Sequence, residues 1–220
     1  MSLLLPKKKK KKIVLFLCTG DTCRGPMAQG YMKKAMEERG IKGIEIKTAG
    51  IMTSHGLIPT QEATLVMRNA DVDINGHRSA VLTEVLIRKA DLILGMSPLQ
   101  TQYAKRLSEE AIGKTYLLKE YAESDLKNYQ INDPMGATLE VYKRVYREMK
   151  LAIDKMLDTK EFFAGPAATK AKKKTATASR KKSSDGKSPS RSRTSKSKTS
   201  GNSKSTRTTA SRSRRKATAS

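Results

Sequence analysis

The feature that most restricts the fold is a short apolar run near the amino terminus that ends in a cysteine. Residues 13–17 are all apolar and rich in strand-forming types, which is typical of a strand buried on both faces. The run stops at residues 18–26, a segment with two glycines, and apolar residues then recur at helical spacing from Met27 until Gly40. The pattern predicts a strand, a glycine-bearing loop and a helix.

The same alternation continues along the chain. Further strand patterns occupy residues 44–47, 90–96 and 115–118, and helical patterns occupy residues 60–69, 97–107 and 138–157. Alternating strands and helices predict an α/β fold in which a parallel sheet is covered by helices on both faces. In such sheets ligands bind beyond the carboxyl ends of the strands, and residues 18–25 lie at such an end.

Most of the positive charge lies outside this region. The 220 residues include 45 Lys and Arg against 21 Asp and Glu, a formal net charge of +24. Six consecutive lysines fill positions 7–12, and residues 166–220 hold 18 basic residues and one acid. The segment between them is almost neutral. We therefore predict a basic arm at residues 1–12, one domain at 13–160 and a basic tail at 161–220.

The composition of residues 166–220 predicts disorder and binding to polyanions. Val, Ile, Leu, Phe, Tyr and Trp are all missing there, so no core offsets the entropy cost of ordering. The segment resembles the basic tails of linker histones and nucleoid proteins, and such charge binds polyphosphates by counterion release. Because the segment has no aromatic residues for base stacking, we expect it to bind nucleic acid without sequence preference. Acidic membrane surfaces or acidic proteins are alternative partners.

Two further properties bear on the compartment. Two cysteines, Cys18 and Cys23, are too few for disulfide bonds to stabilise a chain of this size, and they suit a reducing environment. No apolar run approaches the roughly 20 residues of a transmembrane helix, and the stretch before the lysines is too short for a signal peptide. We expect a soluble cytoplasmic protein that its tail brings to a nucleoid or to chromatin.

The loop after the first strand combines residues suited to phosphate chemistry. We expect Gly20 and Gly25 to let the backbone curl so that its N–H groups face inward, with the positive end of the next helix beside them. Arg24 offers a planar fork that matches two phosphate oxygens. In this positive field we expect Cys18 to have a pKa well below its usual value of about 8.5 and to act as a thiolate nucleophile.

Displacement at phosphorus also needs a proton for the leaving group. Asp133 is the best candidate for the general acid, because it lies in a turn-rich segment, Asn132-Asp133-Pro134-Met135-Gly136, just before the last predicted helix. The same carboxylate would later act as a base on the water that hydrolyses the cysteinyl-phosphate.

These motifs resemble the low-molecular-weight protein tyrosine phosphatases. The resemblance rests on Cys18-Thr19-Gly20-Asp21-Thr22-Cys23-Arg24 after a buried strand and on the late Asp-Pro pair, and it extends over residues 13–158 to Thr48-Ala49-Gly50, Gly76-His77-Arg78-Ser79 and Leu118-Lys119-Glu120-Tyr121. It implies a four-stranded parallel sheet with helices on both faces and no metal or other cofactor. It also implies a nucleophile, a phosphate ligand, a general acid and a surrounding phosphate loop, namely Cys18, Arg24, Asp133 and the loop residues Thr19, Gly20, Asp21, Thr22, Cys23 and Gly25. His77-Arg78-Ser79 has two interpretations: a solvated turn or, as the resemblance implies, a support for the loop that takes no part in catalysis.

Two loop positions depart from the family pattern. Members usually have Asn in place of Asp21 and Ser in place of Gly25, the Asn holding the loop and the Ser hydroxyl steadying the thiolate. The loss of both predicts slower turnover, and a carboxylate that points inward would raise the pKa of Cys18. Cys23 has two interpretations: a disulfide partner that protects Cys18 during oxidation, or a small buried residue under the loop.

From this resemblance we expect the substrate to be a phosphorylated protein, with phosphotyrosine and phosphoarginine as the two candidates. Thr22 and the Asp-Pro-Met-Gly segment match in part the bacterial branch that resembles protein-arginine phosphatases, and a small polar wall suits a guanidinium group. Met135 would be an adaptable apolar wall. Arsenate reduction is disfavoured because no cysteine follows Cys23. The competing class is a nucleic-acid-associated binding protein whose phosphatase domain is weakened or inactive.

Overall fold

The computed structural model describes residues 10–122 and 128–164. Nearly all of the arm predicted at residues 1–12 and the tail beyond residue 164 lie outside the described residues. The predictions of disorder and of polyanion binding therefore concern residues that the structure does not describe.

Four parallel strands form the central sheet. They run in the order β2-β1-β3-β4, and their bounds are β1 Lys12–Cys18, β2 Ile44–Gly50, β3 Leu92–Gly95 and β4 Thr115–Leu117. Each strand coincides with a predicted strand pattern to within a few residues. The expected α/β fold with a four-stranded parallel sheet is confirmed.

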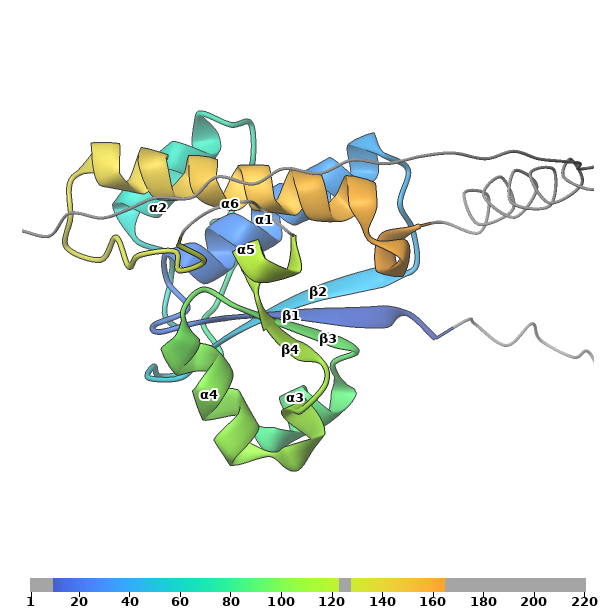
Figure 1. The fold of residues 1–220 in the computed structure, drawn as a ribbon. Coiled ribbons are helices and arrows are strands. Elements are labelled where there is room, and N and C mark those ends of the chain that lie inside the picture. Colours follow the sequence, from blue (N-terminus) through green and yellow to red (C-terminus); the bar gives the residue numbers. More distant parts are fainter. Residues whose placement is uncertain (1–9, 123–127, 165–220) are drawn as a thin grey trace, which may run out of the picture. The chain divides into compact units, whose positions relative to one another are not determined.

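Helices cover both faces of the sheet (Figure 1). One face carries α1 (Arg24–Glu38), α2 (Gln61–Arg68), α5 (Leu118–Tyr121) and α6 (Leu139–Thr159), and the other carries α3 (Glu84–Lys89), α4 (Pro98–Leu107) and the 3-10 turn η1 (Glu109–Ala111). The sequence pattern did not indicate α3 or α5, because six and four residues are too few to show helical periodicity. Among the described residues, no helix is both long enough and apolar enough to cross a membrane.

The alternation of side chains along β1 divides the interior into two cores. Val14 and Phe16 belong to the core under α1 and α6, whereas Leu15 and Leu17 belong to the core under α3 and α4. All four are at most 1% exposed. The continuous apolar run is therefore the central strand that the sequence predicts, buried on both faces.

The fold extends slightly beyond the predicted domain boundary. After α6 the 3-10 turn η2 (Glu161–Phe163) places Phe163 in the core, where it is 2% exposed. We assigned residues 161–163 to the tail, but they belong with the domain, because burial of an aromatic ring offsets the cost of ordering this last turn.

The topology positions Cys18 at the point where the strand order reverses. The chain leaves β1 to form β2 on one side and later returns to form β3 on the other side. Cys18 pairs with Gly50 at the carboxyl end of β1. A crevice for ligands is expected at such a switch point, so the fold brings the loop of residues 18–25 to the correct edge of the sheet.

Candidate active site

The loop between β1 and α1 closes around the sulfur of Cys18. The side chain is 1% exposed, and the backbone N–H groups of Asp21 and Gly25 donate hydrogen bonds to it. Helix α1 begins at Arg24 and directs its positive amino-terminal end to the same place. The structure therefore brings together the nucleophile, loop amides and helix end that the sequence predicts for an anion site.

Neighbouring residues hold the outer side of the loop. The carbonyl groups of Thr19, Gly20 and Thr22 accept hydrogen bonds of 2.7–3.0 Å from residues in the 52–60 segment. Because these acceptors are engaged away from Cys18, they do not oppose a bound anion.

Asp21 gives the loop its curl. Its backbone φ is +53°, in the left-handed region that aspartate tolerates better than most residues, whereas neither Gly20 nor Gly25 has a positive φ. The curl that we expected from the two glycines thus comes from Asp21. His77 Nε2 lies 2.9 Å from the Asp21 carbonyl oxygen, which places His77 in the supporting position implied by the resemblance.

The Asp21 carboxylate points into the protein and is fully buried. Its Oδ2 accepts hydrogen bonds from Thr48 Oγ1 and from the backbone N–H of Ala80, each at 3.0 Å. Burial raises the pKa of Asp21 to about 7, although these two donors act in the opposite direction. The side chain can therefore carry a proton near neutral pH.

The prediction of a lowered pKa for Cys18 is wrong for this loop. Burial, together with the negative charge of the Asp21 carboxylate, raises the pKa of its thiol to about 12. The positive charge of Arg24 and the loop N–H groups lower the pKa, but by less than burial raises it. A sequence reveals the nearby cation, whereas the loss of solvent around the sulfur depends on the packed fold.

Arg24 connects the loop to a distant segment of the chain. Its guanidinium donates to Thr19 Oγ1 and to the carbonyl oxygen of Ile131, both at 3.0 Å, and it forms an ion pair with Asp133. The Arg24 side chain is 3% exposed and that of Asp133 is 38% exposed. The fold thus brings all three proposed catalytic residues to one place, with the acid on the solvent side.

The family model described as low molecular weight phosphotyrosine protein phosphatase matches residues 13–174. The chain belongs to this family. The match runs from Ile13, the second residue of β1, through η2.

Phosphatases of the family and arsenate reductases are similar to this chain over most of their own length. A protein-arginine-phosphatase of Geobacillus stearothermophilus is 30% identical over 66% of this chain and 93% of its own. An arsenate reductase of Staphylococcus aureus is 30% identical over 66% of this chain and 95% of its own. The crystal structure of a low molecular weight protein tyrosine phosphatase from T. tengcongensis superposes with a TM-score of 0.63 at 33% identity, covering 68% of this chain and 100% of that one.

Cys23 is a buried free thiol in this phosphatase, as is Cys18. Its sulfur lies 3.3 Å from the Tyr142 hydroxyl and 3.7 Å from Thr60 Oγ1. These contacts favour the interpretation of Cys23 as a small buried residue that packs the loop against α2 and α6. The protective disulfide remains a prediction about an oxidised form.

No role was predicted from the sequence for two residues that support the phosphatase loop. Gln100 is 1% exposed; its Oε1 accepts from the backbone N–H groups of Met96 and Ser97, and its Nε2 donates to Thr19 Oγ1 at 3.2 Å. Thr48 holds Asp21. A glutamine three residues after the Ser97-Pro98 helix start was a usable signal for Gln100, whereas no local signal connects Thr48 to residue 21.

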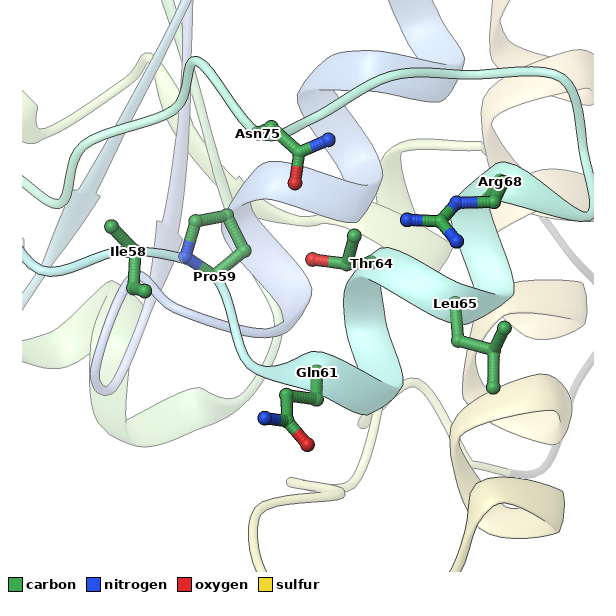
Figure 2. Close-up of a pocket in the computed structure, with 7 residues that line it drawn as sticks. All are labelled: Ile58, Pro59, Gln61, Thr64, Leu65, Arg68 and Asn75. Carbon is green, nitrogen blue, oxygen red and sulfur yellow. The ribbon is translucent and has the colours of Figure 1, made fainter.

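A separate groove lies beside α2 (Figure 2). It encloses about 390 Å³, and none of its lining residues belongs to the phosphate loop. The residues that line it are Ile58, Pro59, Gln61, Thr64, Leu65, Arg68 and Asn75. The groove therefore does not contain the candidate catalytic groups.

Proposed function

We propose that this member of the phosphatase family hydrolyses phosphorylated proteins through a cysteinyl-phosphate intermediate. The observation that carries the proposal is the convergence of Cys18, Arg24 and Asp133, which come from β1, α1 and the segment before α6. A nucleophile, a bidentate phosphate ligand and an exposed carboxyl group are the parts that phosphoryl transfer to sulfur requires.

Each residue has a defined role in the proposed reaction. The Cys18 thiolate attacks phosphorus, forming the S–P bond as the bond to the leaving group breaks. The loop N–H groups and Arg24 stabilise the equatorial oxygens, and Asp133 donates a proton to the departing oxygen or nitrogen. Asp133 then removes a proton from water, which attacks the cysteinyl-phosphate and returns Cys18 as the thiolate.

Hydrolysis of p-nitrophenyl phosphate by wild type and by Cys18→Ser tests this function. We expect the variant to lose activity by more than about 1,000-fold, because serine at this position is a far weaker nucleophile. Asp71→Asn, at an exposed position outside the loop, is the control variant and should retain activity. Equal background rates for wild type and Cys18→Ser would instead support a binding protein with an inactive phosphatase domain.

Among phosphoprotein substrates, we propose a preference for phosphoarginine over phosphotyrosine. Thr22 has a small polar side chain on the loop that is 7% exposed, and Met135 is 55% exposed two residues beyond the acid. A threonine hydroxyl can meet a guanidinium group, which an aliphatic side chain cannot. The similarity to a protein-arginine-phosphatase adds support. Rates on matched phosphoarginine and phosphotyrosine peptides decide the question, and a clear preference for phosphotyrosine contradicts this part.

Arsenate reduction is a less suitable function for this chain, although a reductase is among its relatives. Reduction of arsenate by a cysteine needs further thiols to receive the oxidation. The chain has only Cys18 and Cys23, and Cys23 contacts Tyr142 and Thr60 under the loop. No third cysteine is present to regenerate the first two.

We further propose that the basic segment at residues 166–220 binds nucleic acid without sequence preference and takes the phosphatase to a nucleoid or to chromatin. Its 18 basic residues against one acid support this role. Contacts with six phosphates would give a log–log salt slope of about −4 to −5. Deletion of the segment should abolish salt-sensitive retention on DNA and leave hydrolysis intact. Unchanged retention would exclude the segment as the binding element.

A further inference from the structure

The two departures of the loop from the family pattern occupy the same space. A Cβ atom added to Gly25 would lie 2.1 Å from Asp21 Oδ1 and 3.2 Å from Cys18 Sγ. A side chain at position 25 would therefore collide with the carboxyl group of Asp21. Glycine at position 25 leaves room for that carboxyl group next to the nucleophile. The two departures are therefore linked, because the carboxyl group of Asp21 fills the space of the side chain that position 25 lacks.

The hydrogen bonds of Asp21 determine which of its oxygens can carry a proton. Oδ2 accepts from the backbone N–H of Ala80 and from Thr48 Oγ1. The backbone N–H of Ala80 can only donate, and Oδ2 accepts best from both donors when it carries no proton of its own. The proton of a neutral Asp21 therefore belongs on Oδ1, the oxygen that lies 4.0 Å from Cys18 Sγ.

The charged and titratable groups around Asp21 leave one acceptor for that proton. His77 Nε2 lies 3.6 Å from Oδ1, but it also lies 2.9 Å from the Asp21 carbonyl oxygen, which can only accept. Nε2 must therefore carry its own hydrogen. Burial lowers the pKa of His77, which favours the neutral form of its ring. Arg24 donates to Thr19, Ile131 and Asp133 and accepts nothing.

We propose that Asp21 and Cys18 share a single proton, and that in the reactive form this proton is on Asp21 Oδ1 and is donated to the Cys18 thiolate. The S–H bond of Cys18 breaks as the O–H bond of Asp21 forms, so the net charge of the pair is unchanged and no further reactant takes part. Asp21 then occupies the place that a serine hydroxyl at position 25 has in the family pattern. The proposal rests on the function proposed above for Cys18.

The acid–base properties of the two groups agree with this exchange. Burial raises the pKa of Asp21 to about 7, which allows it to take a proton near neutral pH. The Asp21 carboxylate is also among the causes that raise the pKa of Cys18. Transfer of the proton to Asp21 removes that negative charge and replaces it with a donor to sulfur.

The alkylation of Cys18 by iodoacetamide over a range of pH tests the shared proton. Peptide mass analysis separates Cys18 from Cys23, and protection by inorganic phosphate shows that the reaction occurs in the loop. In the wild type we expect the rate to rise up to about pH 7 and then to level off. Above this pH the pair holds one proton, and its division between sulfur and oxygen does not depend on pH.

Asp21→Asn keeps a hydrogen-bond donor next to the sulfur but cannot share a proton. We expect its alkylation rate to continue rising by about tenfold per pH unit above pH 7, as for an isolated thiol below its pKa. Asp71→Asn is the matched control, because Asp71 also has a positive φ, of +55°, but is exposed. It should follow the wild type. Levelling that persists in Asp21→Asn overturns the proposal.

Gly25→Ser provides a second and independent variant. Its Cβ displaces the Asp21 carboxyl group, so we expect the levelling to disappear here as well. Levelling that survives in Gly25→Ser, or a wild-type profile that rises without levelling, also overturns the shared proton. Because alkylation needs no turnover, these results are independent of whether the protein proves to be a phosphatase in the p-nitrophenyl phosphate assay.

Discussion

Arg24 binds Asp133 across 109 residues of sequence. The same guanidinium nitrogen, Nη2, also donates to Thr19 Oγ1, and Nη1 donates to the Ile131 carbonyl oxygen. A phosphate that binds two nitrogens of the Arg24 guanidinium must replace Asp133 as a hydrogen-bond partner of Nη2. We therefore expect substrate binding to release Asp133 toward the leaving group, so that one contact links phosphate recognition to proton donation.

The first prediction concerns Asp133→Asn, which keeps an acceptor for Arg24 but removes the proton. We expect kcat to fall by about 100- to 10,000-fold for a phenyl phosphate with a poor leaving group, and by much less for p-nitrophenyl phosphate. Steady-state rates over a series of substituted phenyl phosphates measure this dependence. An equal loss over the whole series would argue against Asp133 as the acid.

Replacement of Arg24 by Lys should separate the effect of its positive charge on activity from the effect of its directed hydrogen bonds. Lysine keeps the positive charge but cannot make the three directed contacts of the guanidinium, so we expect kcat/KM to fall by about 100-fold. Arg68→Lys, on the exposed face of α2, is the matched control and should behave as the wild type. Similar activity in the two variants would show that the directed contacts of Arg24 are not required for catalysis.

Substrate preference should respond to Thr22→Val, which replaces the hydroxyl with a methyl group of similar size. We expect the ratio of kcat/KM for phosphoarginine to that for phosphotyrosine to decrease by about tenfold, the effect of one lost polar contact. Both peptides should share one flanking sequence. A ratio that does not change would remove Thr22 as a determinant of specificity.

The free energy of unfolding should decrease as pH rises, because of Asp21. Its pKa is about 7 in the folded state and 3.8 as the ordinary value, so between these pH values the folded state holds a proton that the unfolded state has lost. Stability contributed by this proton is complete below about pH 4 and is lost as pH rises to about 7, an effect of up to about 4 kcal/mol.

Urea unfolding of wild type and Asp21→Asn at several pH values measures this contribution. The variant has no proton to lose at this position, so its advantage in unfolding free energy over the wild type should grow between about pH 4 and pH 7 and then stay constant. Asp71→Asn corrects for the removal of a carboxylate from the surface. A difference independent of pH would show that Asp21 does not titrate in this window.

The local chemistry of the site could be predicted because it depends on neighbours in sequence. An apolar strand ending at Cys18, with Arg24 six residues later at the start of a helix, places a thiol and a cation on one loop in any right-handed strand–helix unit. Asp133 was found from its turn-rich surroundings. The short helix α3 was missed, because its six residues show no periodicity and only Thr83 at its start signals it.

The acid–base behaviour of Cys18 could not be predicted in the same way. The sequence shows a nearby arginine and a helix start, and both favour a thiolate. Burial acts in the opposite direction and has the larger effect on the pKa. Desolvation depends on what the packed chain places around the sulfur, and no spacing rule contains that information.

The sequence by itself determined the order of strand, loop and helix and the identity of the nucleophile and its cation, because these follow from residues that lie close together along the chain. Only the tertiary structure decided the role of Asp21. Thr48 and Ala80, which lie 27 and 59 residues away, bind one of its oxygens, and the missing side chain of Gly25 admits the other next to Cys18. Proton sharing depends on distances between atoms, and such distances are set when distant segments pack.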